Sequence, residues 1–374
     1  MRFGVLTELT PQERRVTITP EGARVLVGGG HEVAIEAGAG VGSGFSDTEY
    51  LAAGAQVLYA PREVAAASDI LVKMHAPTEA EQELIREGMT VLGFLHLASA
   101  SPVWHRRFAD RKATTLSFEL VREGVEEYPI LETLSALGGR VAVALAAYHL
   151  TVPGGGPGVL LGGCSGVPPA MVLVIGGGTA GQAAAAEAAA LGAQVVILDR
   201  DPRRLQRMER TVGRVAVTAT ATEYHIARYV EQANVVIGAV AVRGEPAPKV
   251  LRRQHIRLMP EGSLFIDMSI DEGGCSETSR PTTPEAPVYE AEGVRHICIP
   301  NLPSEVANTA SRALGAILLP YLVALGEGVR PALSRSDALR HACGFLEGQL
   351  VNRALRKFIA APLVDLDALV PRAE

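Results

Sequence analysis

Short apolar runs alternate with amphipathic segments over the first 125 residues of the chain. The apolar runs at 3–6, 33–35, 70–74 and 91–95 predict buried strands. A segment of helical spacing begins at Pro20, and proline is favoured in the first turn of a helix. Strands that alternate with helices indicate a parallel sheet covered on both faces, so this part of the chain predicts an α/β domain.

A second series of apolar runs begins after a loop. Residues 151–158 are too rich in proline and glycine for a helix or a central strand. The runs that follow are continuously apolar, as parallel strands covered on both faces require. They lie at 171–175, 194–198, 234–240, 264–268 and 296–299. The sequence therefore predicts a second α/β domain.

Long helical patterns connect these two parts. Residues 131–150 are long enough to bridge two domains, although each glycine of Gly138-Gly139 costs about 1 kcal/mol relative to alanine. Residues 313–325 and 336–358 are helical again, and we expect them to return to the first domain. The expected domains are 1–130 with 306–374, and 131–305.

Length and charge exclude several classes of protein. The 374 residues suit two domains of ordinary size, and a net charge of −6 leaves no electrostatic footprint for nucleic acid. The mostly apolar stretches at 141–152 and 313–325 are shorter than the roughly 18 residues that cross a bilayer. The N-terminus becomes acidic at Glu8, before a signal-peptide core. We expect a soluble, cytoplasmic protein without a membrane or nucleic-acid partner.

Cysteines and histidines give no metal-binding pattern. The cysteines form no Cys-x-x-Cys pair, and the nine histidines form no His-x-x-x-His pair. We interpret the cysteines as reduced packing residues and expect neither a disulfide nor a metal site. They are Cys164, Cys275, Cys298 and Cys343.

A glycine-rich segment predicts a dinucleotide site. It lies between an apolar strand and an alanine-rich helix, and Asp199 follows Gly181 by 18 positions, close to the expected spacing of about 20. The glycines allow a tight turn, approach of the backbone to a pyrophosphate, and close packing of helix on strand. The helix N-terminus attracts the same pyrophosphate. The predicted cofactor-binding residues here are Gly176, Gly178, Thr179, Ala180, Gly181 and Asp199.

Asp199 favours NAD over NADP. Its carboxylate can accept hydrogen bonds from both ribose hydroxyls and would repel a 2′-phosphate. NADP remains the alternative, because Arg200, Arg203 and Arg204 follow closely and an arginine could hold that phosphate.

Residues that follow further strands are expected around the nicotinamide, because ligands of open α/β sheets bind beyond the carboxyl ends of the strands. They are Val240, Asp271 and Asn301. Asp271 precedes Gly273-Gly274, a flexible turn that could aim the carboxylate into the cleft. The alternative for Asp271 is a helix or turn cap.

Three residues of the first domain are expected to face the same cleft. Arg15 could bind a substrate carboxylate in bidentate fashion, and its alternative is a solvated arginine beside Arg14. His96 ends the apolar run at 91–95 and could transfer protons near neutral pH. His75 ends the run at 70–74 in the same way. The alternative for both histidines is a satisfied core residue.

Together these segments resemble the alanine dehydrogenase and nicotinamide-nucleotide transhydrogenase α-subunit family. The segments that carry the resemblance are 4–22, 36–45, 95–98, the nucleotide fingerprint and 270–274, in the expected order. The chain is more similar to alanine dehydrogenase than to the transhydrogenase subunit. The resemblance implies two Rossmann-like domains, the first completed by C-terminal helices, with NAD between them and usually a hexamer.

The resemblance also implies roles for single residues. Arg15 corresponds to the carboxylate-binding arginine, His96 to the catalytic histidine and Asp271 to the catalytic aspartate. Ser135 corresponds to a serine near the cofactor pyrophosphate. The family's substrate-binding lysine falls on His75, and a carboxylate, Glu305, appears in the loop beside the nicotinamide.

These departures indicate that the substrate is an amino or imino acid other than alanine. The first hypothesis is therefore an NAD-dependent oxidoreductase that acts on such a CH–NH group. The second is an enzyme that holds NAD and uses it transiently, without net redox change. The third is a nucleotide-binding partner protein whose chemistry has lapsed, although Arg15, His96 and Asp271 together argue against it.

Overall fold

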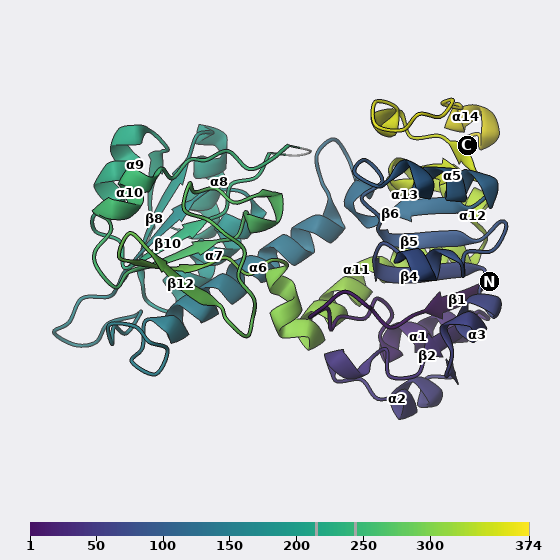
Figure 1. Ribbon diagram of the computed structural model, residues 1–374, viewed down its shortest axis with the longest axis horizontal. Helices are drawn as coiled ribbons and strands as arrows, with labels where there is room; N and C mark the ends of the chain where they lie inside the picture. Colours follow the sequence, from purple (N-terminus) through teal and green to yellow (C-terminus); the bar gives the residue numbers. More distant parts are fainter. Residues whose placement is uncertain (214–215, 243–244, 374) are drawn as a thin grey trace. The chain divides into compact units, whose positions relative to one another are not determined.

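The computed structural model describes residues 1–213, 216–242 and 245–373. The chain forms two compact units (Figure 1). Unit 1 contains residues 1–134 and 307–374, and unit 2 contains residues 135–306. The sequence analysis expected the domain boundaries after residues 130 and 305. In the structure they fall after residues 134 and 306, which is four residues and one residue later.

Unit 1 is built on a six-stranded parallel sheet of order β3-β2-β1-β4-β5-β6. This order, in which the chain reverses direction beside β1, is that of a Rossmann-like fold. The strands are β1 (Arg2–Val5), β2 (Glu32–Glu36), β3 (Gln56–Leu58), β4 (Ile70–His75), β5 (Thr90–Phe94) and β6 (Thr114–Ser117).

Helices cover both faces of this sheet. Ile70 and Val72 of β4 lie in one hydrophobic core with Leu314 of a C-terminal helix, whereas Leu71 lies in another core with Phe108. Both faces of the sheet are therefore shielded from solvent, which explains why the strands are almost continuously apolar. The helices are α1 (Pro20–Gly28), α2 (Asp47–Ala52), α3 (Pro61–Ala66), α4 (Glu79–Gln82), α5 (Pro102–Asp110), α11 (Ala307–Gly326), α12 (Val329–Arg335), α13 (Asp337–Ala342) and α14 (Leu366–Leu369).

Unit 2 is built on a seven-stranded sheet of order β12-β13-β11-β10-β7-β8-β9, in which only the edge strand β12 is antiparallel among the described strands. Apart from β12, the order repeats that of unit 1, so each unit is a Rossmann-like α/β fold. The strands are β7 (Met171–Ile175), β8 (Gln194–Asp199), β9 (Ala216–Thr220), β10 (Val235–Gly238), β11 (Leu264–Asp267), β12 (Val288–Ala291) and β13 (Val294–Ile297). The helices are α6 (Pro129–His149), which begins in unit 1, α7 (Thr179–Ala190), α8 (Pro202–Thr211), α9 (Glu223–Val230) and α10 (Arg253–Leu258).

One predicted helix is wrong. Within 336–358 the only α-helix is α13, which is followed by the short antiparallel strands β14 (Phe345–Leu346) and β15 (Gln349–Leu350) and by a 3-10 turn at Arg353–Leu355. Gly348 has a φ of +82°, which ends helical geometry, and the amide of Phe345 bonds to Thr115 of β6 at 2.9 Å. Tertiary pairing with the sheet therefore overrides the local helical pattern.

The glycine pair in α6 does not break the helix. A Cβ atom on Gly139 would lie 2.2 Å from the carbonyl oxygen of Ala180. The missing side chain allows α6 to contact the first turn of α7 closely, so Gly139 serves packing between two helices of unit 2.

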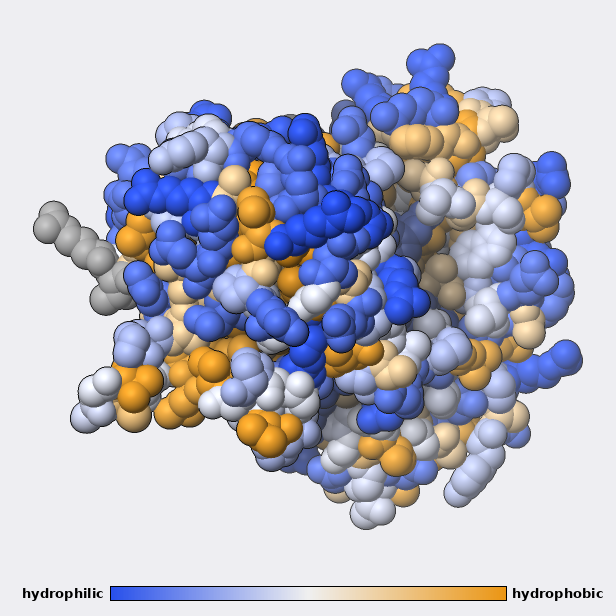
Figure 2. Space-filling model, turned by 60° about the vertical axis from the view of Figure 1, so that its left-hand side comes forward, coloured by the Kyte–Doolittle hydropathy of each residue, from blue (hydrophilic) through white to orange (hydrophobic). Residues whose placement is uncertain are grey.

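Two helices are longer than the apolar stretches suggest. Residues 129–149 and 302–326 are long and apolar enough to cross a membrane by length and composition, which corrects the expectation that such stretches are too short. About half of each apolar window is buried, 44% and 50%, as in helices that pack in a protein core, so the finding is weak evidence for a membrane span. On the face shown in Figure 2, hydrophobic residues lie in small groups among hydrophilic ones.

Candidate active site

The glycine-rich loop connects β7 to α7 in unit 2. Gly176 has a φ of +109°, and a Cβ atom there would lie 2.2 Å from the carbonyl oxygen of Ala239. A Cβ atom on Gly181 would lie 1.8 Å from the carbonyl oxygen of Gly176. A Cβ atom on Gly178 would meet no described atom within 4 Å. Two of the glycines are therefore required by the fold, and the third borders open space.

This open space fits a pyrophosphate. Gly178 is the N-cap of the 12-residue helix α7 and, as a glycine, offers no side chain that could cap the helix amides. Thr179 and Ala180 form the first turn, whose amide groups are the usual anion ligands of a helix N-terminus. The residues present therefore fit a dinucleotide.

Asp199 ends β8 and holds the glycine loop in place. Its buried carboxylate accepts hydrogen bonds from the amides of Gly177 at 2.6 Å and Asp201 at 2.7 Å. Arg204 Nη1 lies 3.8 Å from Asp199 Oδ2, whereas Arg203 pairs with Asp201. Asp199 therefore has a structural role in the loop that the sequence analysis did not identify.

The predicted nicotinamide-side residues follow neighbouring strands of unit 2. The amide of Val240, after β10, donates to Ser269 Oγ at 3.0 Å. Asp271 lies in a 3-10 turn, Ile270–Glu272, and its Oδ2 accepts a hydrogen bond from the amide of Asn301 at 3.1 Å. The structure thus brings Asp271 and Asn301 together through a bond between residues 30 positions apart, which is not the local bond that a helix or turn cap makes.

Ser135 lies in α6, about one helical turn before the glycine pair. The neighbouring Gly138 approaches Met268 and Pro303, which flank the predicted nicotinamide-side segments in the sequence. Glu305 lies in the 3-10 segment Leu302–Val306 and is exposed.

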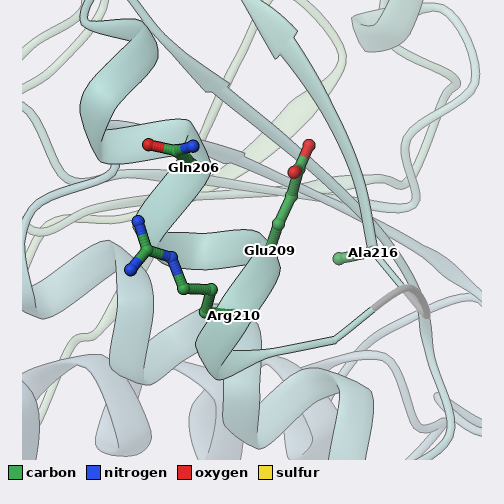
Figure 3. Close-up of a pocket in the computed structure, with 4 residues that line it drawn as sticks. All are labelled: Gln206, Glu209, Arg210 and Ala216. Carbon is green, nitrogen blue, oxygen red and sulfur yellow. The ribbon is translucent and has the colours of Figure 1, made fainter.

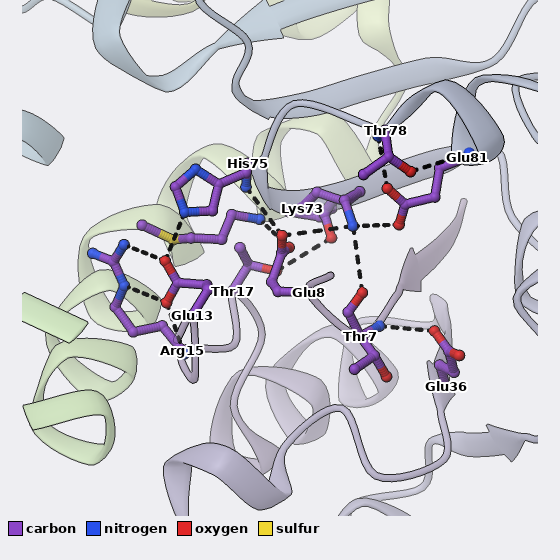
Figure 4. A network of polar contacts seen from close by, with 12 residues as sticks. Thr7, Glu8, Glu13, Arg15, Thr17, Glu36, Lys73, His75, Thr78 and Glu81 are labelled. Carbon is purple, nitrogen blue, oxygen red and sulfur yellow. Dashed lines mark hydrogen bonds and ion pairs between the residues drawn. The ribbon is translucent and has the colours of Figure 1, made fainter. Parts of the chain in front are cut away.

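A buried ion cluster lies at the carboxyl end of β4 in unit 1 (Figure 4). Arg15 donates from Nε to Glu13 Oε1 at 2.8 Å and from Nη2 to Glu13 Oε2 at 2.6 Å. His75 Nε2 lies 2.7 Å from the same Oε2. Glu13 therefore joins Arg15 and His75, two residues predicted to bind substrate.

The exposed fractions of the Arg15 and His75 side chains test the alternatives of a solvated arginine and a buried core histidine. The side chain of Arg15 is 1% exposed, and Arg14 is the exposed arginine of the pair. The side chain of His75 is 28% exposed. Burial opposes ionisation of Glu13, but hydrogen bonds from Arg15 and His75 outweigh it and hold the pKa of the carboxyl well below its usual range. Arg15 is therefore not a solvated arginine, and His75 is not a fully buried core residue.

A second ion cluster lies behind His75. Lys73 is buried, and its Nζ lies 2.6 Å from Glu81 Oε1 and 3.6 Å from Glu8 Oε2. Glu8 also accepts hydrogen bonds from the amides of Met74 at 2.6 Å and His75 at 3.3 Å. Burial raises the pKa of Glu8, and the charge of Lys73 opposes this shift. Glu8 thus holds the backbone of His75 while Glu13 holds its ring.

The sequence analysis missed Glu8, Lys73 and Glu81 as parts of this site. The available signal was Lys73 itself, a charged residue within the apolar run at 70–74. A fully buried lysine almost always has an acidic partner, so this position predicted a buried ion pair in the sheet.

His96 follows β5, the strand next to β4, and is exposed. It has a φ of +45°, and its ring stacks on Phe94 with the ring centres 6.2 Å apart. The amide of His96 donates to Glu119 Oε1 at 2.8 Å. The alternative of a buried core histidine is therefore wrong for His96.

The structure contains other candidate features that lie apart from these residues. A surface pocket of about 540 Å³ is lined by Gln206, Glu209 and Arg210 of α8 and by Ala216 of β9, none of which is a predicted site residue (Figure 3). Among the described residues, no group of three His, Cys, Asp or Glu side chains could hold a metal ion. Cys164 is exposed and the other three cysteines are buried, all as free thiols.

The chain contains two Rossmann-like units, and one of them carries a glycine-rich loop whose amide at Gly177 is bound by the carboxylate of Asp199. This combination is that of a dinucleotide-dependent oxidoreductase of the α/β class. Comparison with known proteins gives the family. Residues 4–137 match the family description "Alanine dehydrogenase/PNT, N-terminal domain", and residues 142–353 match "Alanine dehydrogenase/PNT, C-terminal domain". The chain belongs to the alanine dehydrogenase/PNT family, and its cofactor is NAD.

Individual relatives match over nearly their whole length. The alanine dehydrogenase of Methanococcus maripaludis is 38% identical over 359 residues, which is 96% of each chain. That of Mycobacterium tuberculosis is 38% identical over 367 residues, which is 98% of each chain. A solved L-alanine dehydrogenase structure has a TM-score of 0.91 and 36% identity, over 96% of this chain and 99% of that one. A transhydrogenase from Sinorhizobium meliloti has a TM-score of 0.79 and 26% identity, over 94% and 99%.

Proposed function

We propose that the protein is an NAD-dependent amino-acid dehydrogenase that catalyses the reversible oxidative deamination of a small amino or imino acid. The observation that carries this proposal is the Glu13–Arg15–His75 cluster, in which a buried guanidinium is fixed beside a half-buried imidazole. A fixed guanidinium is the group that best recognises a carboxylate, the one feature common to these substrates. We assign unit 1 to substrate and unit 2 to NAD.

NAD, when bound, would supply hydride-transfer chemistry at the substrate Cα, and the protein's own residues would bind and orient the substrate. Arg15 binds the substrate carboxylate and so fixes the orientation of the molecule. His96, which is exposed, moves a proton to and from the substrate nitrogen or oxygen. Asp271 orients water and stabilises positive charge on the substrate.

NAD has a defined set of proposed ligands in unit 2. The amides after Gly178, in the first turn that contains Thr179 and Ala180, would hold the pyrophosphate, with Ser135 nearby. Asp199 would bind the ribose hydroxyls. Val240 and Asn301 would border the nicotinamide.

We further propose that the preferred substrate is not alanine. His75 stands where the resemblance places a lysine, so the position carries a smaller group whose charge depends on pH. The ring lies 2.7 Å from Glu13 Oε2, and we infer that this shorter side chain admits a larger substrate side chain or a secondary amine.

Steady-state kinetics test both proposals. A panel of amino acids with NAD, and of keto acids with NADH and an amine, is followed by NADH absorbance. We expect net NADH formation with at least one amino acid, and a higher kcat/KM for it than for alanine. Highest activity with alanine would place the protein with its named relatives. NADH that appears only transiently on the enzyme would indicate a reaction without net redox change, and no NADH with any substrate would indicate lapsed chemistry.

We propose a cytoplasmic homo-oligomer, with six copies as the resemblance implies. In support, the loop after α6 carries exposed apolar side chains, with Val152 72%, Leu160 66% and Val167 58% exposed. Where exposed apolar side chains form a contiguous patch they mark a surface that contacts another protein, and we propose this loop as part of such a surface. Light scattering coupled to size exclusion measures the assembly, and a monomer at micromolar concentration would contradict this proposal.

A further inference from the structure

The turn that carries Asp271 ends in two glycines with left-handed backbone. Gly273 has a φ of +93° and Gly274 a φ of +80°. Such residues leave the regular pattern of backbone hydrogen bonds, so their carbonyls need other donors. Lys249 supplies them: its Nζ donates to the carbonyl oxygen of Gly273 at 2.6 Å and to that of Gly274 at 2.8 Å. One side chain therefore holds both carbonyls directly after the turn.

The backbone on either side of Lys249 binds the same loop. The amide of Ala247 donates to the carbonyl oxygen of Glu272 at 2.9 Å. The amide of Leu251 donates to the carbonyl oxygen of Cys275 at 3.0 Å. Four consecutive carbonyls are therefore bound by one short segment of unit 2. The two outer bonds are made by backbone amides, whereas the two inner bonds depend on the lysine side chain.

Asp267, the last residue of β11, holds this loop from the protein interior. Its carboxylate is fully buried and accepts hydrogen bonds from the amides of Ser269 at 2.9 Å and Cys275 at 2.8 Å, and from the hydroxyl of Ser279. A Cβ atom on Gly274 would lie 2.8 Å from Asp267 Oδ2. The buried carboxylate thus fixes both ends of the loop, and the close approach requires a glycine between them.

We propose that Lys249 is a positioning residue for Asp271: its ammonium group fixes the glycine turn and so sets the place of the carboxylate. This rests on the proposed role of Asp271, which orients water and stabilises positive charge on the substrate. Because Lys249 is exposed, its two bonds contribute little to the stability of the whole unit. Their effect is local, on the backbone within two residues of Asp271.

Hydrogen exchange of backbone amides, followed by mass spectrometry, tests whether Lys249 holds the turn and needs no substrate. The amides of Gly273 and Gly274 report on the turn because both donate to carbonyls at its start, at 2.9 and 2.8 Å. Lys249→Met removes the donors, whereas Lys249→Arg keeps several donors on a long side chain. Lys357→Met is the matched control, because Lys357 is also exposed and lies over the ring of Phe358 in unit 1.

We expect the two glycine amides to exchange about tenfold faster or more in Lys249→Met, since the turn opens locally. Lys249→Arg should exchange nearly as the unmodified protein does, and Lys357→Met should not differ from it. Tm should be almost the same in all four proteins. Unchanged exchange in Lys249→Met would overturn the proposal.

Kinetics with the best substrate test whether the turn serves Asp271. We expect kcat to fall about tenfold in Lys249→Met, with KM changed less than about twofold, because the proposed carboxylate ligand lies in unit 1. Lys249→Arg should recover most of this loss. A merely structural role would leave the kcat of the folded enzyme unchanged, and that result would also overturn the proposal.

Asp271→Asn separates this proposal from the proposed function. If Asp271→Asn retains full kcat, the role of Asp271 is wrong and the positioning role fails with it, even where exchange is faster. If Asp271→Asn is inactive while Lys249→Met retains full kcat, only the positioning role fails. No activity of the unmodified protein with any substrate would overturn both.

Discussion

The Glu13 carboxylate binds Arg15 and His75 at the same oxygen, with Oε2 2.6 Å from Arg15 Nη2 and 2.7 Å from His75 Nε2. A substrate carboxylate that binds Arg15 must therefore do so beside an anion that already neutralises part of the guanidinium charge. A permanent cation at position 75 would offset that anion. The side chain at position 75 therefore sets the charge of the pocket, which is the basis of the first prediction.

The KM for pyruvate should depend on the charge of the side chain at position 75, because a carboxylate binds a cation more tightly than a neutral group. His75→Lys introduces a permanent cation and should lower the KM for pyruvate by about tenfold, since such a charge is worth roughly 1.4 kcal/mol or more there. An unchanged KM in His75→Lys would reject the idea, and His225→Lys, in unit 2, is the control.

Arg15 should be required for both stability and activity. Arg15→Met leaves Glu13 buried with less compensation, and breaking a buried pair costs about 3–5 kcal/mol. Adding Glu13→Gln should restore most of the thermal stability but none of the lost kcat/KM, which we expect to fall at least about a hundredfold, or 2.7 kcal/mol. A double variant no more stable than Arg15→Met would show that the ion pair does not carry the stability effect.

The stability of the protein should depend on the ionisation of Glu119. Because burial raises the pKa of its carboxyl, the folded state favours the protonated form. Its stabilising contribution is complete below the usual carboxyl range and is lost as pH rises through the raised pKa. Glu119→Gln should therefore have a higher Tm than the unmodified protein at neutral pH, and the difference should vanish toward pH 4. An equal difference at both pH values would contradict the assignment.

Substitutions of the fingerprint glycines should affect either thermal stability or NAD affinity, depending on the position. Gly181→Ala should lower thermal stability because its Cβ would lie 1.8 Å from a carbonyl oxygen. Gly178→Ala has open space and should fold normally, yet lose NAD affinity about tenfold or more because its methyl group would occupy the pyrophosphate site. Gly28→Ala, also in open space, is the control. Normal NAD binding by Gly178→Ala would show that the cofactor does not approach this loop.

Asp199→Ala should reduce NAD affinity by about tenfold or more, measured by NADH fluorescence, because it removes the ribose acceptor and also releases the amides of Gly177 and Asp201. Asp199→Asn keeps one acceptor oxygen and should retain more affinity. If Asp199→Ala binds NAD normally, the fingerprint has been misassigned.

The strands were the part of the fold that the sequence predicted best. The run at 171–175 coincides with β7, because both faces of this parallel sheet are shielded from solvent and apolar residues are favoured at every position of the strand. The pattern at 336–358 failed because its later residues pair with β6, a contact made across more than 200 residues. Local periodicity contains no information about such a partner.

The sequence allowed individual residues of the candidate site to be selected, but not the contacts between them. His75 ends β4, His96 follows β5 and Arg15 lies in the segment after β1, so these residues could be selected by position and by resemblance. Glu119 could not, because its importance comes from the order β5-β6, which places two strand ends together. Glu8 and Glu81 could not be selected either, because their role is to pair with Lys73, which lies on another element.

A contact of the C-terminal segment decides when the pocket around Arg15 can form during translation. Ser311 of α11 accepts a hydrogen bond from the amide of Val16 at 2.9 Å and lies 2.7 Å from the hydroxyl of Ser43, so it braces the segment that contains Arg15. On the ribosome, unit 2 is complete at residue 306, directly before this helix is synthesised, whereas unit 1 must wait for the helix. The arginine pocket is thus among the last features to mature during translation, and a nascent chain arrested before α11 would present an NAD fold without a finished place for a carboxylate.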